Sequence, residues 1–140
     1  MTYILDTNVL SEMMKKTPDR TVYSWLGVVT FQALHITTIT QTEILYGISS
    51  LPRGKRRDDL FARFQLLTEV YFEEHVLQFD AEAALCCADI RVSCKKAGRP
   101  IQIADAMIAG IVSSYNATLV SRDSVFEDCG FPVINPWMAK

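Results

Sequence analysis

The sequence predicts an α/β fold, with residues 1–140 forming a single domain around a mainly parallel central sheet of four to five strands flanked by helices. Three observations predict this class. Short apolar runs bounded by polar turns alternate with longer segments of helical period. The length of 140 residues corresponds to about one average domain. Apolar residues make up 49% of the chain, which is enough for a hydrophobic core.

The first strand is predicted at Tyr3–Leu5, a short apolar run. Asp6–Asn8 then ends this strand and caps a helix over Val9–Lys16, which stops before Pro18 because the residue before a proline disfavours helical geometry. Asp19 caps a second helix. The apolar face of this second helix, spaced i, i+3, i+4 and i+7, is formed by Val22, Trp25, Leu26 and Val29.

A second strand is predicted at Leu34–Thr37. Thr40 and Glu43 have the spacing of a capping box, in which each side chain binds the other residue's backbone, so a helix is expected to open there and continue through Leu51. The segment Pro52–Gly54 interrupts it because proline and glycine disfavour helix continuation.

A long helix is predicted over Asp58–Tyr71, packing one side against the sheet. A third strand follows at Val76–Phe79. Asp80 caps an alanine-rich helix that runs to about Ala97 and is ended by Gly98.

The segment Ile101–Tyr115 is apolar on all sides apart from Asp105, its only charged residue, and is expected to be a buried helix beside the centre of the sheet. The remaining elements are a strand at Thr118–Val120, a short helix at Ser124–Asp128 and a terminal edge strand at Pro132–Asn135, where a leading proline is tolerated.

Composition excludes several classes of protein. A net charge of -2 argues against a surface coated in positive charge for non-specific nucleic-acid binding, although it leaves a local basic patch open. The four cysteines form no metal-binding or disulfide framework and are interpreted as small buried side chains in a reducing compartment: Cys86, Cys87, Cys94 and Cys129. No signal peptide or membrane span is predicted, so a cytoplasmic location is expected.

Two other sets of side chains carry less information. His35 and His75 are isolated in the sequence, and no Ser-His-Asp arrangement can be built from them. Four aromatic residues fall on apolar helical faces and are expected in the core or at a dimer interface: Trp25, Tyr46, Phe61 and Phe64.

Four acids stand out because each is close to the end of a predicted strand or the start of the following helix. They are Asp6, Glu43, Asp105 and Asp123. The carboxyl ends of parallel strands meet at one edge of the sheet, so these acids are expected to converge there. Helix capping is the alternative explanation for all of them except Asp105, whose carboxylate in a buried helix requires a cation or a strong donor nearby.

A cluster of carboxylates without His or Cys favours Mg²⁺ or Mn²⁺ over Zn²⁺. Such a site suits attack of a water molecule on a phosphodiester, with the cation neutralising the charge that develops in the transition state. Asn8 and Ser121 are candidates for orienting the water or a phosphate oxygen from behind the metal ligands.

Four blocks of the sequence together resemble the signature blocks of PIN-domain ribonucleases, in the order of that family. They are Tyr3–Leu10, Thr42–Gly47, Ala104–Ala109 and Ala117–Asp123. Two further segments, Leu51–Arg57 and Asn135–Trp137, resemble the VapC and FitB type of toxin from type II toxin-antitoxin systems.

The resemblance implies metal-dependent RNA cleavage, a homodimer, and inhibition by a small antitoxin encoded beside the toxin. It also implies that the catalytic, metal-binding acids are Asp6, Glu43, Asp105 and Asp123, with Asn8 and Ser121 as polar companions. Two departures concern the metal. Many relatives have a further acid where this chain has Gln102 and Ile103, so the resemblance leaves open whether the site holds one metal ion or two. At position 123 many relatives have Asn, and the Asp of this chain favours metal binding.

Five cations are candidate RNA contacts: Arg53, Lys55, Arg56, Arg57 and Arg122. For the four cations between positions 53 and 57, a solvated surface loop is an equally good explanation. Outside the four proposed metal ligands, the chain carries a net charge of +2. Its acidity is thus concentrated at one edge, where bound divalent cations would attract phosphate.

The sequence therefore predicts a metal-dependent endoribonuclease toxin. One alternative is a phosphatase with Asp6 as nucleophile, but enzymes resembling the haloacid dehalogenases need a second Asp two residues later, where this chain has Asn8. The other alternative is a non-catalytic module of the same fold that binds RNA or an antitoxin and acts as a co-repressor.

Overall fold

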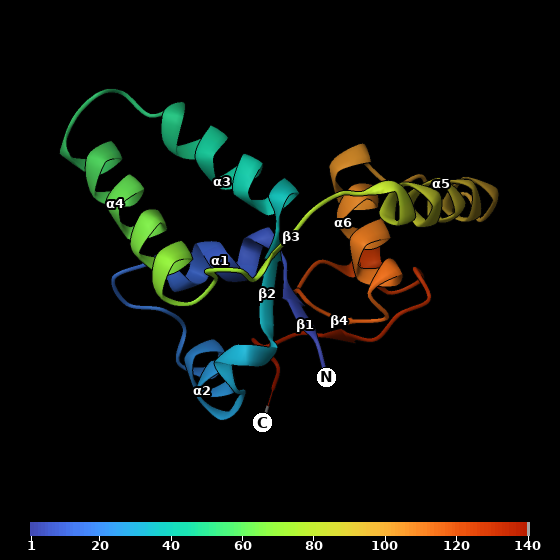
Figure 1. The fold of residues 1–140 in the computed structure, drawn as a ribbon, viewed down its shortest axis with the longest axis horizontal. Coiled ribbons are helices and arrows are strands. Elements are labelled where there is room, and N and C mark those ends of the chain that lie inside the picture. The colour runs from blue at the N-terminus through green and yellow to red at the C-terminus, as the bar shows by residue number, and fades with distance from the viewer. Residues whose placement is uncertain (140) are drawn as a thin grey trace.

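The computed structural model describes residues 1–139 and contains a five-stranded sheet between two groups of helices (Figure 1). The strands are β1 (Tyr3–Leu5), β2 (Leu34–Thr37), β3 (Val76–Leu77), β4 (Thr118–Val120) and β5 (Val133–Ile134). Their order is β3-β2-β1-β4-β5, and every neighbouring pair is parallel. The predicted fold class is confirmed, and the sheet is parallel throughout the described residues.

Six α-helices and two 3₁₀ helices connect the strands. They are α1 (Thr7–Met13), α2 (Arg20–Val28), η1 (Phe31–Ala33), α3 (Thr38–Ser49), α4 (Lys55–Val70), α5 (Ala81–Lys96), α6 (Ile103–Ser114) and η2 (Ser124–Phe126). In Figure 1, α1 to α4 lie on one side of the sheet, and α5 and α6 lie on the other. None of these helices is long and apolar enough to cross a membrane.

Two apolar clusters cover the two faces of the sheet. Alternation along β1 places Ile4 in the cluster with α5 and α6, and Leu5 in the cluster with α1 to α4. Along β4, Leu119 and Val120 divide in the same way. Burial on both faces explains why the strand sequences are continuous apolar runs and do not alternate with polar residues.

The helix α6 lies in the first cluster, as its apolar sequence predicts. Its residues from Ile108 to Val112 are all buried. A Cβ added to Gly110 would lie 2.5 Å from the carbonyl oxygen of Ala83 and 2.8 Å from Cβ of Cys87, so only glycine permits this approach of α5 to α6. This close contact fixes the helix that carries Asp105.

Several predicted helix ends were wrong. The first helix begins at Thr7, two residues before Val9, because Asp6 itself is the N-cap. The helix predicted from Asp58 begins at Lys55, directly after Gly54. This placement moves Lys55, Arg56 and Arg57 of the predicted basic loop into the first turn of α4, where the helix dipole disfavours cations.

The strands and the last helix are shorter than predicted. β3 ends at Leu77, and β5 consists of Val133 and Ile134 alone. Pro132 precedes β5 and contributes its carbonyl oxygen, which accepts a hydrogen bond from the Leu119 N–H. The short helix after β4 is the 3₁₀ turn η2.

His35 and His75, which are isolated in the sequence, lie side by side in space. The rings of His35 and His75 stack with centroids 4.6 Å apart and planes 10° apart. Parallel pairing of β2 with β3 brings them together, because Ile36 N–H donates to the carbonyl oxygen of His75. The four cysteines are free thiols; Cys87 and Cys94 are buried as expected, whereas Cys86 and Cys129 are only half-buried, contrary to the prediction.

The aromatic side chains divide between the core and the surface. Phe64 is buried on α4, and Trp25 packs its ring edge against Tyr3 with centroids 5.5 Å apart. Tyr46 is 71% exposed and Phe61 is 43% exposed. The first pair belongs to the core, and the second pair is available for contact with a partner.

Candidate active site

The strand order reverses between β1 and β4, at the centre of the sheet. The chain leaving β1 proceeds to β2 and β3 on one side, then returns through α5 and α6 to β4 on the other. Such a switch point opens a crevice beyond the carboxyl ends of the two central strands. Asp6 directly follows β1, and Ser121 directly follows β4.

Asp6 is held by three neighbours at this crevice. The Ser121 hydroxyl donates to its Oδ2 at 2.7 Å, the Asn8 amide donates to the same oxygen at 3.3 Å, and the Thr7 N–H donates to Oδ1 at 2.9 Å. Asp6 is therefore both the N-cap of α1 and part of a polar network, and capping and a site role are not exclusive alternatives.

Ser121 and Asn8 complete this network. The Ser121 hydroxyl oxygen accepts from the Asn8 amide at 3.2 Å and from the backbone N–H of Asp123 at 3.0 Å. Asn8 Oδ1 is buried and has no hydrogen-bond partner among the described residues. The structure thus places both predicted companions beside Asp6, with an acceptor oxygen left open.

Glu43 is tied to α1 by the hydroxyl of Thr7, a residue not among the predicted site residues. The Thr7 hydroxyl donates to Glu43 Oε1 at 2.6 Å and lies 3.1 Å from the Thr40 hydroxyl. The predicted capping box of Thr40 and Glu43 is wrong, because Thr37 caps α3 and receives the Thr40 N–H. The position of Thr7 between Asp6 and Asn8, inside the first family-like block, is the signal that could have identified it.

Asp123 also has two contacts of different kinds. Its Oδ1 accepts from the Val125 N–H at 3.1 Å, which makes it the N-cap of η2. Its own N–H donates to the Ser121 hydroxyl. The residue is exposed, and its charge acts on both Asp6 and Asp105.

The carboxylates influence one another electrostatically. Burial, followed by the charges of Asp6, Asp123 and Glu43 in that order, raises the pKa of Asp105 to about 6. Burial also raises the pKa of Asp6, opposed by the hydrogen bonds from Ser121 and Thr7 and supported by the charges of Glu43 and Asp123. The four acids selected from the sequence therefore share one region of space.

The cation or strong donor expected beside Asp105 is absent from residues 1–139. Every influence on the pKa of Asp105 raises it. The ion pairs of the described residues are Lys15–Glu12 and Arg99–Asp128, and neither includes one of the four acids. The negative charge at this edge is not balanced by the described protein groups.

No three His, Cys, Asp or Glu side chains in residues 1–139 are already arranged to hold a metal ion. The donor set nevertheless fits Mg²⁺ or Mn²⁺ chemically, because it consists of carboxylate oxygens with an unpartnered amide oxygen beside them. The Thr7 hydroxyl holds one carboxylate oxygen of Glu43, and the Val125 N–H holds one of Asp123.

A groove opens beside Glu43, between α1, α3 and α4, with a volume of about 890 Å³. Its apolar residues include Met14, Ile44, Ile48, Leu51 and Leu60. Five cations also line it: Lys15, Lys16, Lys55, Arg56 and Arg63. Of the predicted RNA contacts, Lys55 and Arg56 thus reach this groove.

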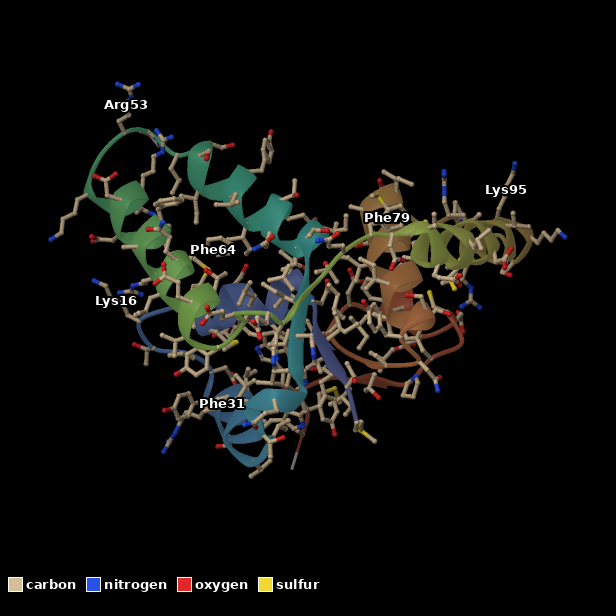
Figure 2. The ribbon with its side chains drawn as sticks, in the orientation of Figure 1. Lys16, Phe31, Arg53, Phe64, Phe79 and Lys95 are labelled. Carbon is tan, nitrogen blue, oxygen red and sulfur yellow. The ribbon has the colours of Figure 1, made fainter. Side chains whose placement is uncertain are left out.

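The other predicted cations lie elsewhere. Arg53 projects from the outer bend between α3 and α4 (Figure 2). Arg57 does not line the groove. Arg122 follows Ser121 directly and places its guanidinium carbon 4.3 Å from the ring centroid of Trp137.

Comparison with known proteins agrees with this geometry. A family model described as PIN domain matches residues 3–132. The chain is 36% identical to the VapC ribonuclease Y4jK of Sinorhizobium fredii, over 96% of each chain. It is 32% identical to the toxin FitB of Neisseria gonorrhoeae, over 96% of this chain and 97% of FitB.

Solved structures show the same relationship. The crystal structure of FitAcB from Neisseria gonorrhoeae superposes with a TM-score of 0.90 at 31% identity, covering 98% of this chain and 99% of the other. A structure of FitAB bound to an IR36 DNA fragment gives a TM-score of 0.91 at 31% identity, covering 99% and 98%. With the matching family model and full-length relatives, these likenesses establish that the chain belongs to the PIN-domain family, in the branch that contains the VapC and FitB toxins.

Proposed function

We propose that this protein is an endoribonuclease toxin that requires Mg²⁺ or Mn²⁺ and is neutralised by an antitoxin. The observation that carries the proposal is the meeting of four acids beyond the carboxyl ends of β1 and β4, none of them in an ion pair of the described residues. A site that concentrates negative charge in this way favours occupation by a cation. The name of the VapC ribonuclease relative supports RNA as the substrate class.

The residues that would hold the cation are Asp6, Glu43, Asp105 and Asp123. When bound, the cation would supply Lewis acidity toward a phosphodiester and neutralise charge in the transition state. The catalytic contribution of the chain itself is to fix the orientation of these carboxylates before substrate arrives, which lowers the cost of reorganisation.

Three polar side chains orient the carboxylates or a water molecule. The Ser121 hydroxyl donates to one oxygen of Asp6 and so determines which lone pairs remain free. The Thr7 hydroxyl does the same for Glu43. Asn8 Oδ1, buried without a partner, is available to accept a hydrogen from a water molecule and orient it.

The test is cleavage of a long mixed-sequence RNA transcript by purified protein. Mg²⁺ or Mn²⁺ should support cleavage, and a chelator should abolish it. Asp6→Asn and Asp105→Asn should each remove activity by at least about 100-fold, because a charge at the reacting centre is lost. Asp6→Asn retains an oxygen that can accept the Thr7 N–H. The matched control is Asp89→Asn, an exposed acid on α5.

Calorimetric titration with Mn²⁺ provides a second readout that does not depend on activity. The unmodified protein and Asp89→Asn should bind Mn²⁺, and Asp105→Asn should bind it at least about tenfold more weakly. Cleavage that persists in both active-site variants, or in excess chelator, contradicts the proposal.

The groove beside Glu43 supports an antitoxin as partner. Its apolar and basic lining residues match a segment with apolar anchors and carboxylates. The FitAB relative is a two-component assembly solved with DNA, and the alternative role as a non-catalytic co-repressor rests on that likeness. A co-repressor would require neither metal nor the four acids, so the cleavage experiment separates the two functions.

Growth of cells that express the toxin tests the groove. The polypeptide encoded beside the toxin should restore growth on co-expression. Leu51→Glu places a charge on the apolar lining of the groove at a partly exposed position and should abolish that rescue without removing toxicity, because Leu51 is not among the four acids. Rescue of Leu51→Glu equal to that of the unmodified toxin would place the antitoxin on another surface.

We also propose a homodimer. Large apolar side chains are exposed on three helices, including Tyr46 on α3, Leu85 on α5 and Ile103 on α6. A second copy would remove such side chains from water. Light scattering should give twice the 15.8 kDa mass of one chain, and a mass of one chain at micromolar concentration would exclude the dimer.

A further inference from the structure

The turn after β5 lies beside the end of β4 and carries a tryptophan onto Arg122. Ser121 N–H donates to the carbonyl oxygen of Ile134 at 2.9 Å, so the chain segments that leave the two strands begin side by side. The guanidinium carbon of Arg122 then stands 4.3 Å from the centroid of the Trp137 ring, a cation–π distance.

Trp137 is anchored on its other side. Its backbone N–H donates to the Asn135 side chain at 3.0 Å, and the Met138 N–H closes the same turn on the Asn135 carbonyl oxygen at 3.1 Å. Pro136 is buried, and the indole packs against the apolar cluster that contains Leu5. The ring is therefore a fixed surface for the arginine.

The backbone of Arg122 is also fixed relative to the acids. It lies between Ser121, whose hydroxyl binds Asp6, and Asp123, whose N–H binds that hydroxyl. Within the described part of the chain, the guanidinium forms no ion pair with any of the four acids. Its charge therefore remains available to another anion at the end of β4.

Whether Arg122 can bind an anion depends on whether its guanidinium is already paired with a carboxylate. Arg99 is paired with the carboxylate of Asp128, which offsets its charge. Neither ion pair of residues 1–139 includes Arg122, which is exposed. An aromatic face restricts the motion of a guanidinium but carries no net charge, so the full positive charge and the hydrogen-bonding fork remain available to an anion.

We propose that Arg122 contacts an RNA phosphate next to the acid cluster and that Trp137 is the positioning residue that holds its guanidinium for this contact. The inference rests on the proposed function, since it names how that site binds its substrate. Four acids repel a phosphodiester, and a fixed cation beside them offsets this repulsion on approach. Holding the side chain in advance reduces the entropy lost on binding.

The binding experiment uses a 5′-fluorescein-labelled, mixed-sequence single-stranded RNA of 20 nucleotides. It is performed in the Asp105→Asn background, so that cleavage does not interfere, at salt concentrations from 50 to 200 mM. Arg122→Gln should weaken binding by about tenfold, as loss of one charge-assisted phosphate contact does, and should lower the salt slope by about 0.7. Arg122→Lys should lie between the two.

The matched control is Lys95→Gln, which removes one charge at the outer end of α5 (Figure 2). It should change the affinity by less than about twofold, because exposed charges separated by more than a Debye length are largely screened. Equal affinities of Arg122→Gln and Lys95→Gln for this RNA would overturn the assignment of Arg122.

The role of Trp137 is measured by a double-mutant cycle. Trp137→Leu should weaken binding by about threefold, and Trp137→Phe should restore part of the loss because an aromatic face remains. In the Arg122→Gln background, Trp137→Leu should have no further effect, because the positioned group is already gone. Equal, additive effects in both backgrounds would show that Trp137 acts only on the fold.

Cleavage kinetics on a long mixed-sequence transcript separate this inference from the proposed function. With Mg²⁺ or Mn²⁺, Trp137→Leu should raise KM by about threefold with kcat nearly unchanged, at a temperature where thermal unfolding shows both proteins folded. If the unmodified protein cleaves while KM is unaffected, the inference alone fails. If the unmodified protein neither binds nor cleaves RNA, the proposed function fails and the role of Arg122 fails with it.

Discussion

The helices pack more tightly on one face of the sheet than on the other. On one side, α5 and α6 approach so closely that a Cβ on Gly110 would lie 2.5 Å from a backbone oxygen. On the other side, α3 and α4 line a groove of about 890 Å³, and Phe64 is the one buried residue of α4. The tight side fixes the position of Asp105, and the open side leaves apolar surface and cations for a partner.

The largest expected effect comes from making the same substitution on each side. Gly110→Ala should lower the free energy of unfolding by about 2–4 kcal/mol, because the new Cβ meets backbone and must separate α5 from α6. Gly47→Ala on α3 meets nothing within 4 Å and should raise it by about 0.5–1 kcal/mol through helix propensity. Urea denaturation measures both, and effects of the same sign would contradict the contrast.

The next largest effect concerns the charge of Asp105, which α6 places at the site. The folded-state pKa of Asp105, about 6, lies above its ordinary value of 3.8, so the folded state binds more protons between these values. This group therefore destabilises the fold above about pH 6 and ceases to do so as the pH falls toward 4.

Asp105→Asn should accordingly raise the free energy of unfolding at pH 7.5, in chelator, by about 1–2 kcal/mol. The difference between variant and unmodified protein should shrink at pH 4.5. Asp89→Asn, an exposed acid on α5, should show neither change. A pH-independent difference would mean that the Asp105 charge is compensated in solution.

A smaller pH effect of opposite sign is expected at the β2–β3 edge of the sheet. Burial lowers the pKa of His35, and the charge of the stacked His75 lowers it further, while hydrogen bonds to the backbone at Ala33 and Tyr3 oppose the shift. A His whose pKa is lowered on folding stabilises the protein above its ordinary pKa of 6.5, and this contribution is lost as the pH falls below it.

His75→Gln removes the neighbouring charge and should therefore reduce the loss of stability between pH 7.5 and pH 5.5. Denaturation at the two pH values, compared in the Asp105→Asn background, isolates this contribution. An unchanged pH dependence would show that the stacked rings do not influence each other's protonation.

The smallest effect lies at the rim of the groove. Arg56 occupies the first turn of α4, where the helix dipole disfavours a cation. Arg56→Glu should raise the free energy of unfolding by about 0.3–1 kcal/mol while weakening rescue of growth by the antitoxin. Increased stability without loss of rescue would show that this cation is not retained for the partner.

The sequence alone determined the alternation of strands and helices and the identity of the four acids. Buried parallel strands are short apolar runs bounded by polar turns, so β1, β2 and β4 were located to the residue. Asp105 could be selected because a lone carboxylate in an apolar helix needs an explanation. These signals are local, and a local pattern can be identified along the chain.

Tertiary structure decided the contacts between elements distant in sequence. Thr7 meets Glu43 across 36 positions, His35 stacks on His75, and Trp137 covers Arg122. Helix starts were also decided there, since Thr37 rather than Thr40 caps α3 once Glu43 is engaged by α1. Strand order and helix packing set these distances, and neither is encoded in the spacing of residues along one segment.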